Sequence, residues 1–175
     1  LEVPADEAEA IVQAARVHDV GKIAISDIIL RKPGALSAEE WEEMNRHPVF
    51  GAQIVGRLPQ YQRGKEYILY HHERYDGSGA LRLRGREIPL GARIIAAADV
   101  FDAMTSDRPY RRAFDRSVAI AEMVRHKGQQ FDPVVVEALV SALQEQGLLR
   151  ETPRLDAFVP PMPLSVPASS TSVRH

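Results

Sequence analysis

The 175-residue sequence contains no cysteine. This absence excludes disulfide bonds and thiolate metal sites, and it fits a reducing compartment, so we expect a cytoplasmic location. No apolar run approaches the roughly 18 residues that a membrane-spanning helix needs, and no secretory signal pattern is visible. An excess of one charge is also lacking, because 22 basic and 24 acidic residues give a formal net charge of -2. Proteins that coat nucleic acid usually carry a strong basic excess, so DNA is not expected as a partner.

Histidine is scarce, and its distribution is informative. Only six histidines occur, and four of them belong to one group of residues that could bind metal. Imidazole and carboxylate groups bind iron, manganese and zinc without sulfur. The candidate ligands are His18, Asp19, His47, His71, His72 and Asp99. The sequence therefore indicates a metal site built from nitrogen and oxygen donors.

The hydrophobic pattern is helical almost throughout, which predicts an all-α fold. A first helix is expected to begin at a capping box formed by Asp6 and Glu9. Its apolar stripe, continued along the chain, places His18 and Asp19 on the inward face of that helix. The His-Asp pair is therefore predicted to point into the interior.

Two further helices are expected to carry the other histidines. Ser37 and Glu40 form a second capping box and open a helix that runs to His47, where Pro48 breaks or kinks it. The next histidines lie on a later helix, whose i, i+3, i+4 and i+7 positions are Ile68, His71, His72 and Tyr75. This spacing turns both histidines toward one face.

The glycine-rich segment 76–91 shows no sustained period and is predicted to be an ordered loop, within which a short hairpin is possible. A helix over 92–105 then places Asp99 and Asp102 on one stripe. A helix over about 117–127 and a last helix, capped by Asp132-Pro133, complete the pattern.

The length suits one domain with a sizeable core. We expect this domain to cover residues 1–148. The remaining residues, 149–175, are rich in proline, serine and threonine with little apolar period, which predicts a mostly disordered tail.

Ligands gathered from several helices around one interior point are how helical bundles build dinuclear metal sites. Two metal ions can activate a water molecule and hold a phosphate between them. A single histidine on an apolar stripe is more often an ordinary core residue. Burying four histidines and two carboxylates together, however, would cost several kcal/mol for each unpaired ion. The metal interpretation is therefore preferred for the group as a whole.

The residues around these ligands resemble a known family. His18-Asp19-Val20-Gly21-Lys22-Ile23 resembles the signature of the HD superfamily of metal-dependent phosphohydrolases, and the succession that follows resembles its HD-GYP branch. The further motifs, in order, are His47-Pro48 with Gly51-Ala52, His71-His72-Glu73-Arg74 with Asp76-Gly77-Ser78-Gly79, Ala98-Asp99-Val100-Phe101-Asp102-Ala103, Arg108-Pro109-Tyr110-Arg111, and Phe131-Asp132-Pro133. An ordered series of this kind is far more specific than a His-Asp pair alone.

The resemblance implies a helical bundle that hydrolyses the bacterial messenger cyclic di-GMP to linear pGpG, to GMP, or to both. It makes the six candidates ligands of two divalent ions, and three in an intact protein, with Asp19 as the bridge. Iron or manganese is expected, with zinc as an alternative. Lys22 matches a residue that contacts the scissile phosphate, and Asp102 a candidate for proton transfer. Arg108 and Arg111 match positions that contact phosphate and guanine.

The sequence departs from the family pattern in two places. The tripeptide Gly-Tyr-Pro that names the branch is replaced by Gly79-Ala80-Leu81. Family members also have an upstream helix that contributes a further histidine, whereas only seventeen residues precede His18 here and none of them is histidine. We expect from this, and from the start at Leu1, that the chain was cut from a larger signalling protein.

Two alternatives remain open at this stage. One is a degenerate module that binds a nucleotide or a protein without catalysis. The other is an enzyme that acts on a different cyclic dinucleotide or on a nucleotide monophosphate. The resemblance leaves open a diguanylate cyclase (GGDEF) domain or a receiver domain as a partner, and a homodimer.

Overall fold

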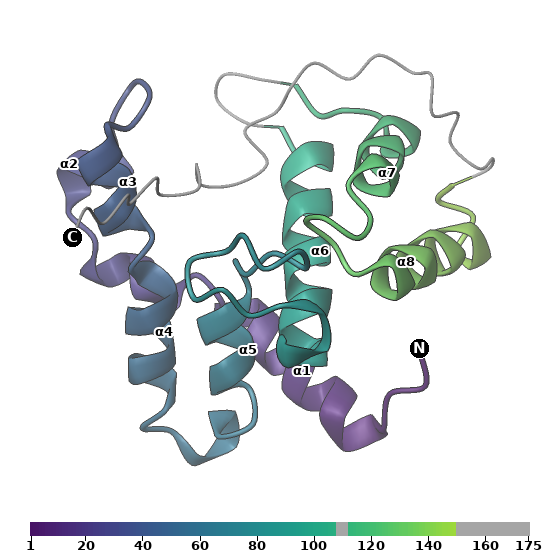
Figure 1. Cartoon of the computed structure of the whole chain (residues 1–175), viewed down its shortest axis with the longest axis horizontal. Helices are drawn as coiled ribbons and strands as arrows, with labels where there is room; N and C mark the ends of the chain where they lie inside the picture. Colours follow the sequence, from purple (N-terminus) through teal and green to yellow (C-terminus); the bar gives the residue numbers. More distant parts are fainter. Residues whose placement is uncertain (108–111, 150–175) are drawn as a thin grey trace, which may run out of the picture.

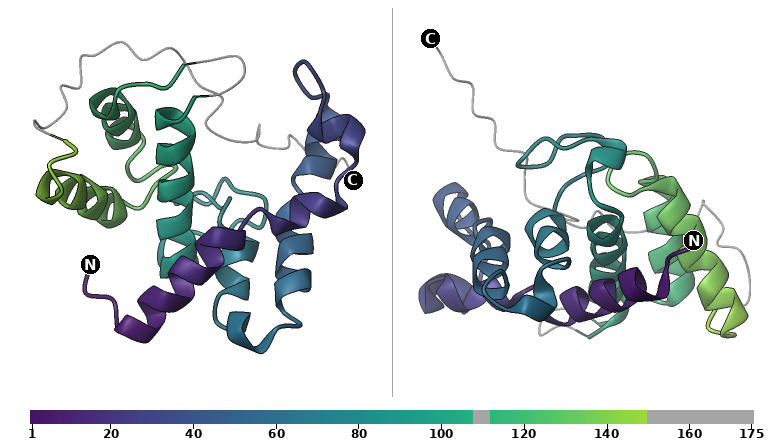
Figure 2. Two further views of the ribbon diagram at one scale, coloured as in Figure 1. Left: turned by 180° about the vertical axis from the view of Figure 1, so that it is seen from behind. Right: turned by 90° about the horizontal axis from the view of Figure 1, so that it is seen from below.

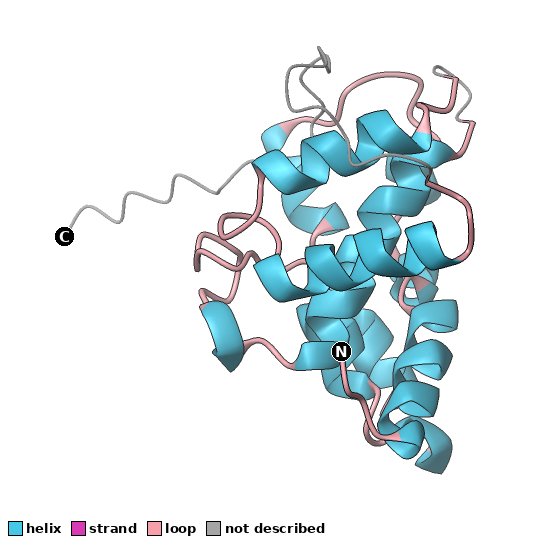
Figure 3. Cartoon of the chain, turned by 90° about the vertical axis from the view of Figure 1, so that its right-hand side faces the viewer, coloured by secondary structure: helices cyan, strands magenta, loops and turns pink. Residues whose placement is uncertain are grey.

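The computed structural model describes residues 1–107 and 112–149. All regular secondary structure in these two stretches is helical, without a strand, which confirms the predicted all-α fold (Figures 1 and 3). The elements, in chain order, are α1 (Ala5–Val17), η1 (Val20–Ala24), α2 (Asp27–Leu30), α3 (Ala38–Met44), α4 (His47–Val55), η2 (Pro59–Tyr61), α5 (Lys65–Tyr70), η3 (Gly85–Glu87), α6 (Leu90–Thr105), α7 (Arg116–Arg125) and α8 (Pro133–Glu145), where η marks a 3-10 helix.

The longest helix, α6, lies at the centre of the bundle (Figure 1). On one side of it α5 and then α4 stand next to one another, and on the other side α7 and α8 pack against it. Helix α1 runs across α5 and α6, as the view from below makes clear (Figure 2). No described helix is long and apolar enough to cross a membrane.

Two hydrophobic clusters meet on α6. The first joins α1, α5 and α6, with Ile11, Ile68 and Ile95 among its buried side chains. The second joins α6 to α7 and α8, with Ile120 and Val136 buried between them. Because one helix contributes to both clusters, α6 is held on two sides, and its position is well determined by packing.

Two of the predicted helix caps are confirmed. Ser37 and Glu40 form the predicted capping box, with the Ser37 hydroxyl accepting from Glu40 N at 3.3 Å and the Glu40 carboxylate accepting from Ser37 N at 2.6 Å. The Asp132 side chain accepts from Val134 N at 2.9 Å and caps α8, as predicted.

The predicted capping box of Asp6 and Glu9 is wrong. Helix α1 begins at Ala5, directly after Pro4, and its start has no side-chain cap. A residue that follows proline can enter a helix at once, because the proline already restricts the backbone that leads into it. The structure therefore starts the helix one residue before the predicted cap.

The expected helix from Ser37 to His47 is also corrected. Helix α3 ends at Met44, and His47 is instead the first residue of α4, with Pro48 in its first turn. Proline is tolerated in the first turn of a helix, where its missing N–H would have had no partner. Pro48 thus marks a helix start, where the sequence pattern had indicated a helix end.

The segment 76–89 is irregular, as predicted, and contains the short helix η3 but no hairpin. Gln129 and Gln130, in the turn before α8, accept backbone hydrogen bonds from Asp76 and Tyr75 at 2.8 and 3.2 Å. The loop is therefore tied to the second half of the bundle at its base. Almost all of the predicted tail lies outside the described residues, and the domain boundary at residue 148 stays a prediction.

Candidate metal centre

Five of the six candidate ligands lie at the ends of helices. His18 directly follows α1, Asp19 precedes η1, His47 begins α4, and His71 and His72 directly follow α5. The sixth, Asp99, is inside α6. The predicted helix-interior stripes are therefore wrong for the two adjacent pairs. Neighbouring residues inside a helix point about 100° apart, whereas a chain that leaves its helix can turn both side chains toward one site.

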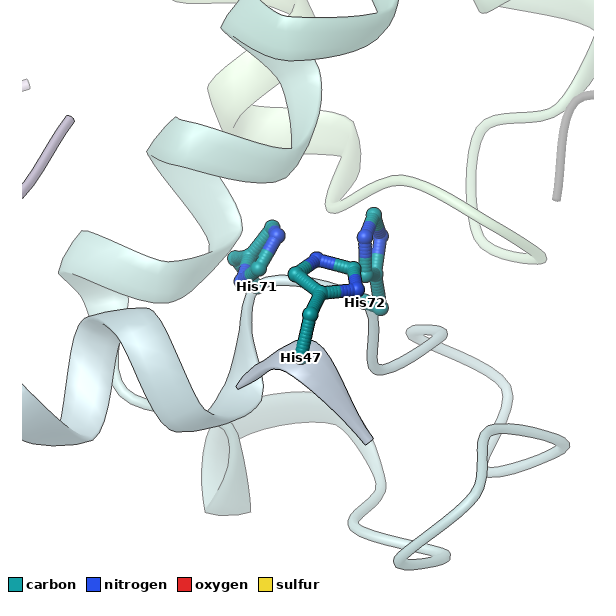
Figure 4. A group of neighbouring side chains, drawn as sticks. All are labelled: His47, His71 and His72. Atoms are coloured by element: carbon teal, nitrogen blue, oxygen red, sulfur yellow. The ribbon is translucent and has the colours of Figure 1, made fainter. Parts of the chain in front are cut away.

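The structure nevertheless brings all six side chains together. His18 Nε2 lies 3.6 Å from Asp19 Oδ2 and 3.6 Å from Asp99 Oδ1. His47 Nε2 lies 3.3 Å from Asp19 Oδ1. The ring centroids of His71 and His72 are 3.9 Å apart, and that of His47 is 5.5 and 5.0 Å from them (Figure 4).

Two overlapping groups of donor atoms are compact enough to hold a metal ion. Within each group the atoms lie no more than 4.8 Å apart. One group is His47, His71 and His72, and the other is His18, Asp19 and His71. Since His71 belongs to both groups, the two positions are neighbours within one centre.

Hydrogen bonds set the tautomer of three of these rings. In His18, His47 and His71, Nδ1 lies 2.7 Å from the backbone carbonyl three residues earlier. A carbonyl only accepts, so Nδ1 carries the proton and Nε2 keeps its lone pair. This is the arrangement by which proteins orient metal-binding histidines.

Two of the resulting lone pairs are buried. Nε2 of His47 and Nε2 of His71 are inaccessible to solvent and have no hydrogen-bond partner among the described residues. The Asp19 carboxylate approaches His47 Nε2 but does not form a hydrogen bond of acceptable geometry with it. Unpaired buried polar atoms are costly, and a divalent metal ion would satisfy both nitrogen atoms. The donor set therefore fits a metal ion.

The site keeps its carboxylates charged and two of its rings neutral. Burial raises the pKa of Asp19, but the neighbouring His47 ring, the hydrogen bond from Lys22 and the Lys22 charge outweigh it, so the pKa falls well below its usual range. At Asp99, burial likewise raises the pKa, but the His18 ring, 3.6 Å away, lowers it further than burial raises it. Burial lowers the pKa of His71 to about 4.

The two remaining rings shift in opposite directions. His72 is at the solvent-exposed edge of the group, yet burial of its ring, followed by the charges of His71 and His47, places its pKa well below its ordinary value. The neighbouring Asp99 carboxylate raises the pKa of His18 against the effect of burial. Near neutral pH, His71 and His72 are therefore neutral donors facing ionised carboxylates, a combination that attracts divalent cations.

Of the other predicted site residues, Lys22 lies at the centre. Its Nζ donates to Asp19 Oδ2 at 2.6 Å, and both side chains are 41% exposed. Asp102 is one turn after Asp99 on α6 but is exposed, and its carboxylate accepts from the Ser106 hydroxyl at 3.2 Å. Within the described stretches, no hydrogen bond or ion pair joins Asp102 to the six ligand candidates.

The predicted substrate-binding residues Arg108 and Arg111 lie outside the described residues. Gly21, in the motif that follows the His-Asp pair, was not among the predicted site residues. A side chain at Gly21 would collide with the backbone of α4, so this glycine lets η1 lie directly against His47. Glu73, which is only 7% exposed, was likewise not among the predicted site residues. The feature of the sequence that could have indicated Glu73 is its position directly after the two candidate ligands His71 and His72.

A dependence of stability on pH follows from these shifts. We expect the metal-free chain to lose stability as the pH falls from the ordinary histidine value of 6.5 toward 4, since the folded pKa of His71 is about 4. His71 and His72 have folded pKa values below their unfolded ones, so their contribution is complete above the unfolded pKa and is lost on acidification. The raised pKa of His18 acts in the opposite direction, because its contribution is present below the unfolded pKa and lost as the pH rises.

The pKa values of two histidines are lowered and that of one is raised. We therefore expect the stability of the metal-free chain to increase with pH over this range. Urea midpoints of chelator-treated protein, measured at intervals between pH 4 and pH 8, check this expectation. The variant His71→Asn should have a flatter profile, because it removes a buried ring whose folded pKa is about 4. A midpoint that stays constant or rises on acidification would contradict the prediction.

The bundle and its His/Asp centre define a helical metal-binding domain, and comparisons with known proteins identify its family. The HD domain family matches residues 1–135, so the chain belongs to the HD domain family. The order of its motifs, together with its relatives, places it in the HD-GYP branch, which confirms the resemblance found in the sequence. HD domain phosphohydrolases are metal-dependent, in agreement with the donor cluster.

Three relatives illustrate the match. The cyclic di-GMP phosphodiesterase response regulator RpfG of Xanthomonas campestris pv. campestris is 47% identical over 138 residues, which cover 77% of this chain and 36% of that protein. A cyclic di-GMP phosphodiesterase of Thermotoga maritima is 47% identical over 135 residues, or 75% of this chain and 37% of that protein. The 3'3'-cGAMP-specific phosphodiesterase 2 of Vibrio cholerae is 43% identical over 142 residues, or 79% of this chain and 27% of that protein.

The chain thus spans about a third of the length of these relatives. A solved structure supports the fold. The crystal structure of a cyclic GMP-AMP-specific phosphodiesterase of Vibrio cholerae matches with a TM-score of 0.64 and 20% sequence identity, over 84% of this chain and 41% of that one. At this level of identity the likeness concerns the helical architecture alone.

Proposed function

We propose that the chain is the catalytic domain of a metal-dependent phosphodiesterase that hydrolyses cyclic di-GMP to pGpG, GMP or both. The observation that carries this proposal is the pair of buried, unpartnered Nε2 lone pairs on His47 and His71, beside the ionised Asp19. Relatives whose names state this activity are 47% identical to the chain. The enzyme acts in bacterial second-messenger signalling, and we place it in the cytoplasm.

The proposed ligands are the six residues predicted from the sequence. We propose two divalent ions for this centre, as the family resemblance implies, and a third would need a further ligand. His71, which the two donor groups share, offers only Nε2 as a donor and can bind only one of the two ions. Iron or manganese is proposed first, because imidazole and carboxylate donors suit both, and zinc is the alternative. When bound, the ions supply Lewis-acid activation of water and of the phosphate oxygens.

The protein groups then orient the substrate and move protons. Asp19 is proposed to bridge the two positions, because its two oxygens face different partners: His47 lies 3.3 Å from Oδ1, and Lys22 lies 2.6 Å from Oδ2. Lys22 is proposed to stabilise the negative charge that develops on the scissile phosphate. Its half-exposed ammonium can leave Asp19 for a phosphate without being desolvated.

Proton transfer to the leaving oxygen is proposed for Asp102, whose exposed carboxylate accepts a hydrogen bond from Ser106 on the outer side of α6. Arg108 and Arg111 are proposed to contact phosphate and guanine, on the basis of the family resemblance. An upstream sensor or receiver domain, a diguanylate cyclase partner and a homodimer are proposed as the context of regulation.

One alternative changes the substrate. Among the relatives, three are named as specific for 3'3'-cGAMP, so discrimination between cyclic dinucleotides varies within this family. The replacement of Gly-Tyr-Pro by Gly79-Ala80-Leu81 lies next to the candidate centre and favours an altered substrate or partner preference. A second alternative is a module that binds a cyclic dinucleotide without cleaving it.

The test begins with elemental analysis of protein purified anaerobically. About two ions per chain are expected if the six proposed ligands suffice. The iron- or manganese-loaded protein is then incubated in parallel with cyclic di-GMP, 3'3'-cGAMP and GMP, and the products are separated by chromatography. Release of pGpG or GMP from cyclic di-GMP supports the proposal. Binding without any product would favour the non-catalytic module, and faster cleavage of 3'3'-cGAMP would favour the altered substrate.

A further inference from the structure

His72 differs from the other three histidines of the centre in how its ring is held. The rings of His18, His47 and His71 each donate to a backbone carbonyl at 2.7 Å. For His72, no hydrogen bond to either ring nitrogen occurs among the described residues, and its side chain is exposed. Its ring stands 3.9 Å from that of His71, centroid to centroid, at 40°. Its ring is also 5.0 Å from that of His47, so its orientation depends on these ring contacts and on the course of its own backbone.

The backbone on the C-terminal side of His72 is fixed by the next residue, Glu73. This carboxylate is buried and accepts two main-chain hydrogen bonds, from Leu81 N to Oε1 at 2.8 Å and from Leu83 N to Oε2 at 3.1 Å. Gly79 packs against the same group, because a Cβ there would lie 2.8 Å from Glu73 Oε2. We call Glu73 with these two amides the Glu73 clasp. It joins the end of the His72 segment to the loop that follows.

One of the two amides exists because this chain departs from the family pattern. The tripeptide Gly-Tyr-Pro would place proline at position 81, and proline has no backbone N–H. Leu81 supplies that N–H, while its own side chain is 52% exposed and contributes little packing. The lost rigidity of proline is thus replaced by a charge-assisted hydrogen bond to a buried carboxylate.

We propose that Glu73 is a positioning residue that holds His72 in place for metal binding through the Glu73 clasp. This inference rests on the metal centre of the proposed function. Of the two donor groups, only the one formed by His47, His71 and His72 contains His72. Loosening the clasp therefore weakens that position, while the ring hydrogen bonds of the other histidines are untouched.

Glu73→Gln tests this with little change of shape. The amide oxygen can accept from one N–H, but its NH₂ group faces the other N–H, so one of the two bonds is lost. Co²⁺ binding to the metal-free 175-residue chain is measured by calorimetry and by visible absorption, for wild type, Glu73→Gln, His72→Ala and the double variant. We expect Glu73→Gln to weaken binding by about tenfold, as for other groups that orient metal ligands, and His72→Ala to weaken it further.

The double variant tests whether Glu73 affects metal binding through His72. If Glu73 acts through His72, the double variant binds Co²⁺ no more weakly than His72→Ala, and the two effects are not additive. A full additional loss in the double variant would overturn the proposal, as would unchanged binding in Glu73→Gln or in His72→Ala. No readout involves a nucleotide, so the result is independent of whether the chain hydrolyses cyclic di-GMP.

Glu87→Gln is the matched control. Its carboxylate accepts from Arg84 N at 2.8 Å in the same loop, but it is exposed and distant in sequence from the ligands. We expect Glu87→Gln to bind Co²⁺ like wild type. Amide hydrogen exchange of Leu81 and Leu83 should accelerate in Glu73→Gln only, which verifies that the clasp was opened while the fold was kept.

Discussion

Asp19→Asn is expected to lower the rate of cyclic dinucleotide hydrolysis about 10³-fold, since metal-assisted charge stabilisation contributes several kcal/mol to such reactions. Asparagine keeps the size and shape of the side chain but removes the charge. In the wild type this carboxylate approaches three cationic or metal-binding groups, the closest being Lys22 Nζ at 2.6 Å and His47 Nε2 at 3.3 Å. A neutral amide cannot bridge two cations.

The fold should survive this change. Asp19 and Lys22 are each 41% exposed, so the unpaired ammonium left behind remains hydrated and costs little stability. Metal content, thermal stability and turnover are measured together on wild type and variant. Asp27→Asn, an exposed acidic residue on α2, serves as control and should keep both metal and activity. An Asp19→Asn protein that retains more than a tenth of the activity would contradict the assignment of the bridge.

Gly21→Ala is expected to destabilise the chain by about 3 kcal/mol, at the upper end of the usual cost of overpacking. A Cβ at this position would lie 1.9 Å from His47 O and 2.4 Å from Gly51 N. Both are backbone atoms of α4, which cannot move aside as a flexible side chain would. Helix η1 would have to separate from α4, and His18 and Asp19 would be displaced from His47.

For a domain of this size, such a change corresponds to a lower melting temperature by about 10 °C. Calorimetry or circular dichroism measures it, and metal content measured at low temperature shows the displacement of the ligands. Gly34→Ala is the control, because a Cβ there meets nothing within 4 Å. That variant should be neutral or slightly stabilised. If Gly21→Ala melts like Gly34→Ala, the close contact between η1 and α4 is not required.

The helical fold could be predicted because helices are specified largely by neighbours in sequence. The capping boxes of Ser37 and Asp132 act within three residues, and both were found as predicted. The prediction failed at Asp6 and at Pro48, where proline competes with other signals. Proline is compatible with either end of a helix, and only the packing of α4 on η1 selects the helix start at His47.

The six ligand candidates were also accessible from the sequence, because their residue types and order carry the family signature. Their surroundings were not. That His47 and His71 present buried lone pairs depends on carbonyl groups at the ends of α3 and α5, whose positions follow from helix boundaries that the pattern misplaced. Asp102 shared a predicted stripe with Asp99 but is exposed and bonded to Ser106.

The amino-acid sequence by itself determined the class of fold, the family and the identity of the candidate ligands, since each depends on residue types and short spacings. Only the tertiary structure decided how near the donors lie, which ring nitrogens are free, and how Glu73 holds the loop after His72. The physical reason is that these features arise from contacts between segments distant in sequence. Backbone atoms of η1 and α4 meet at Gly21, and no local pattern encodes the distance between them.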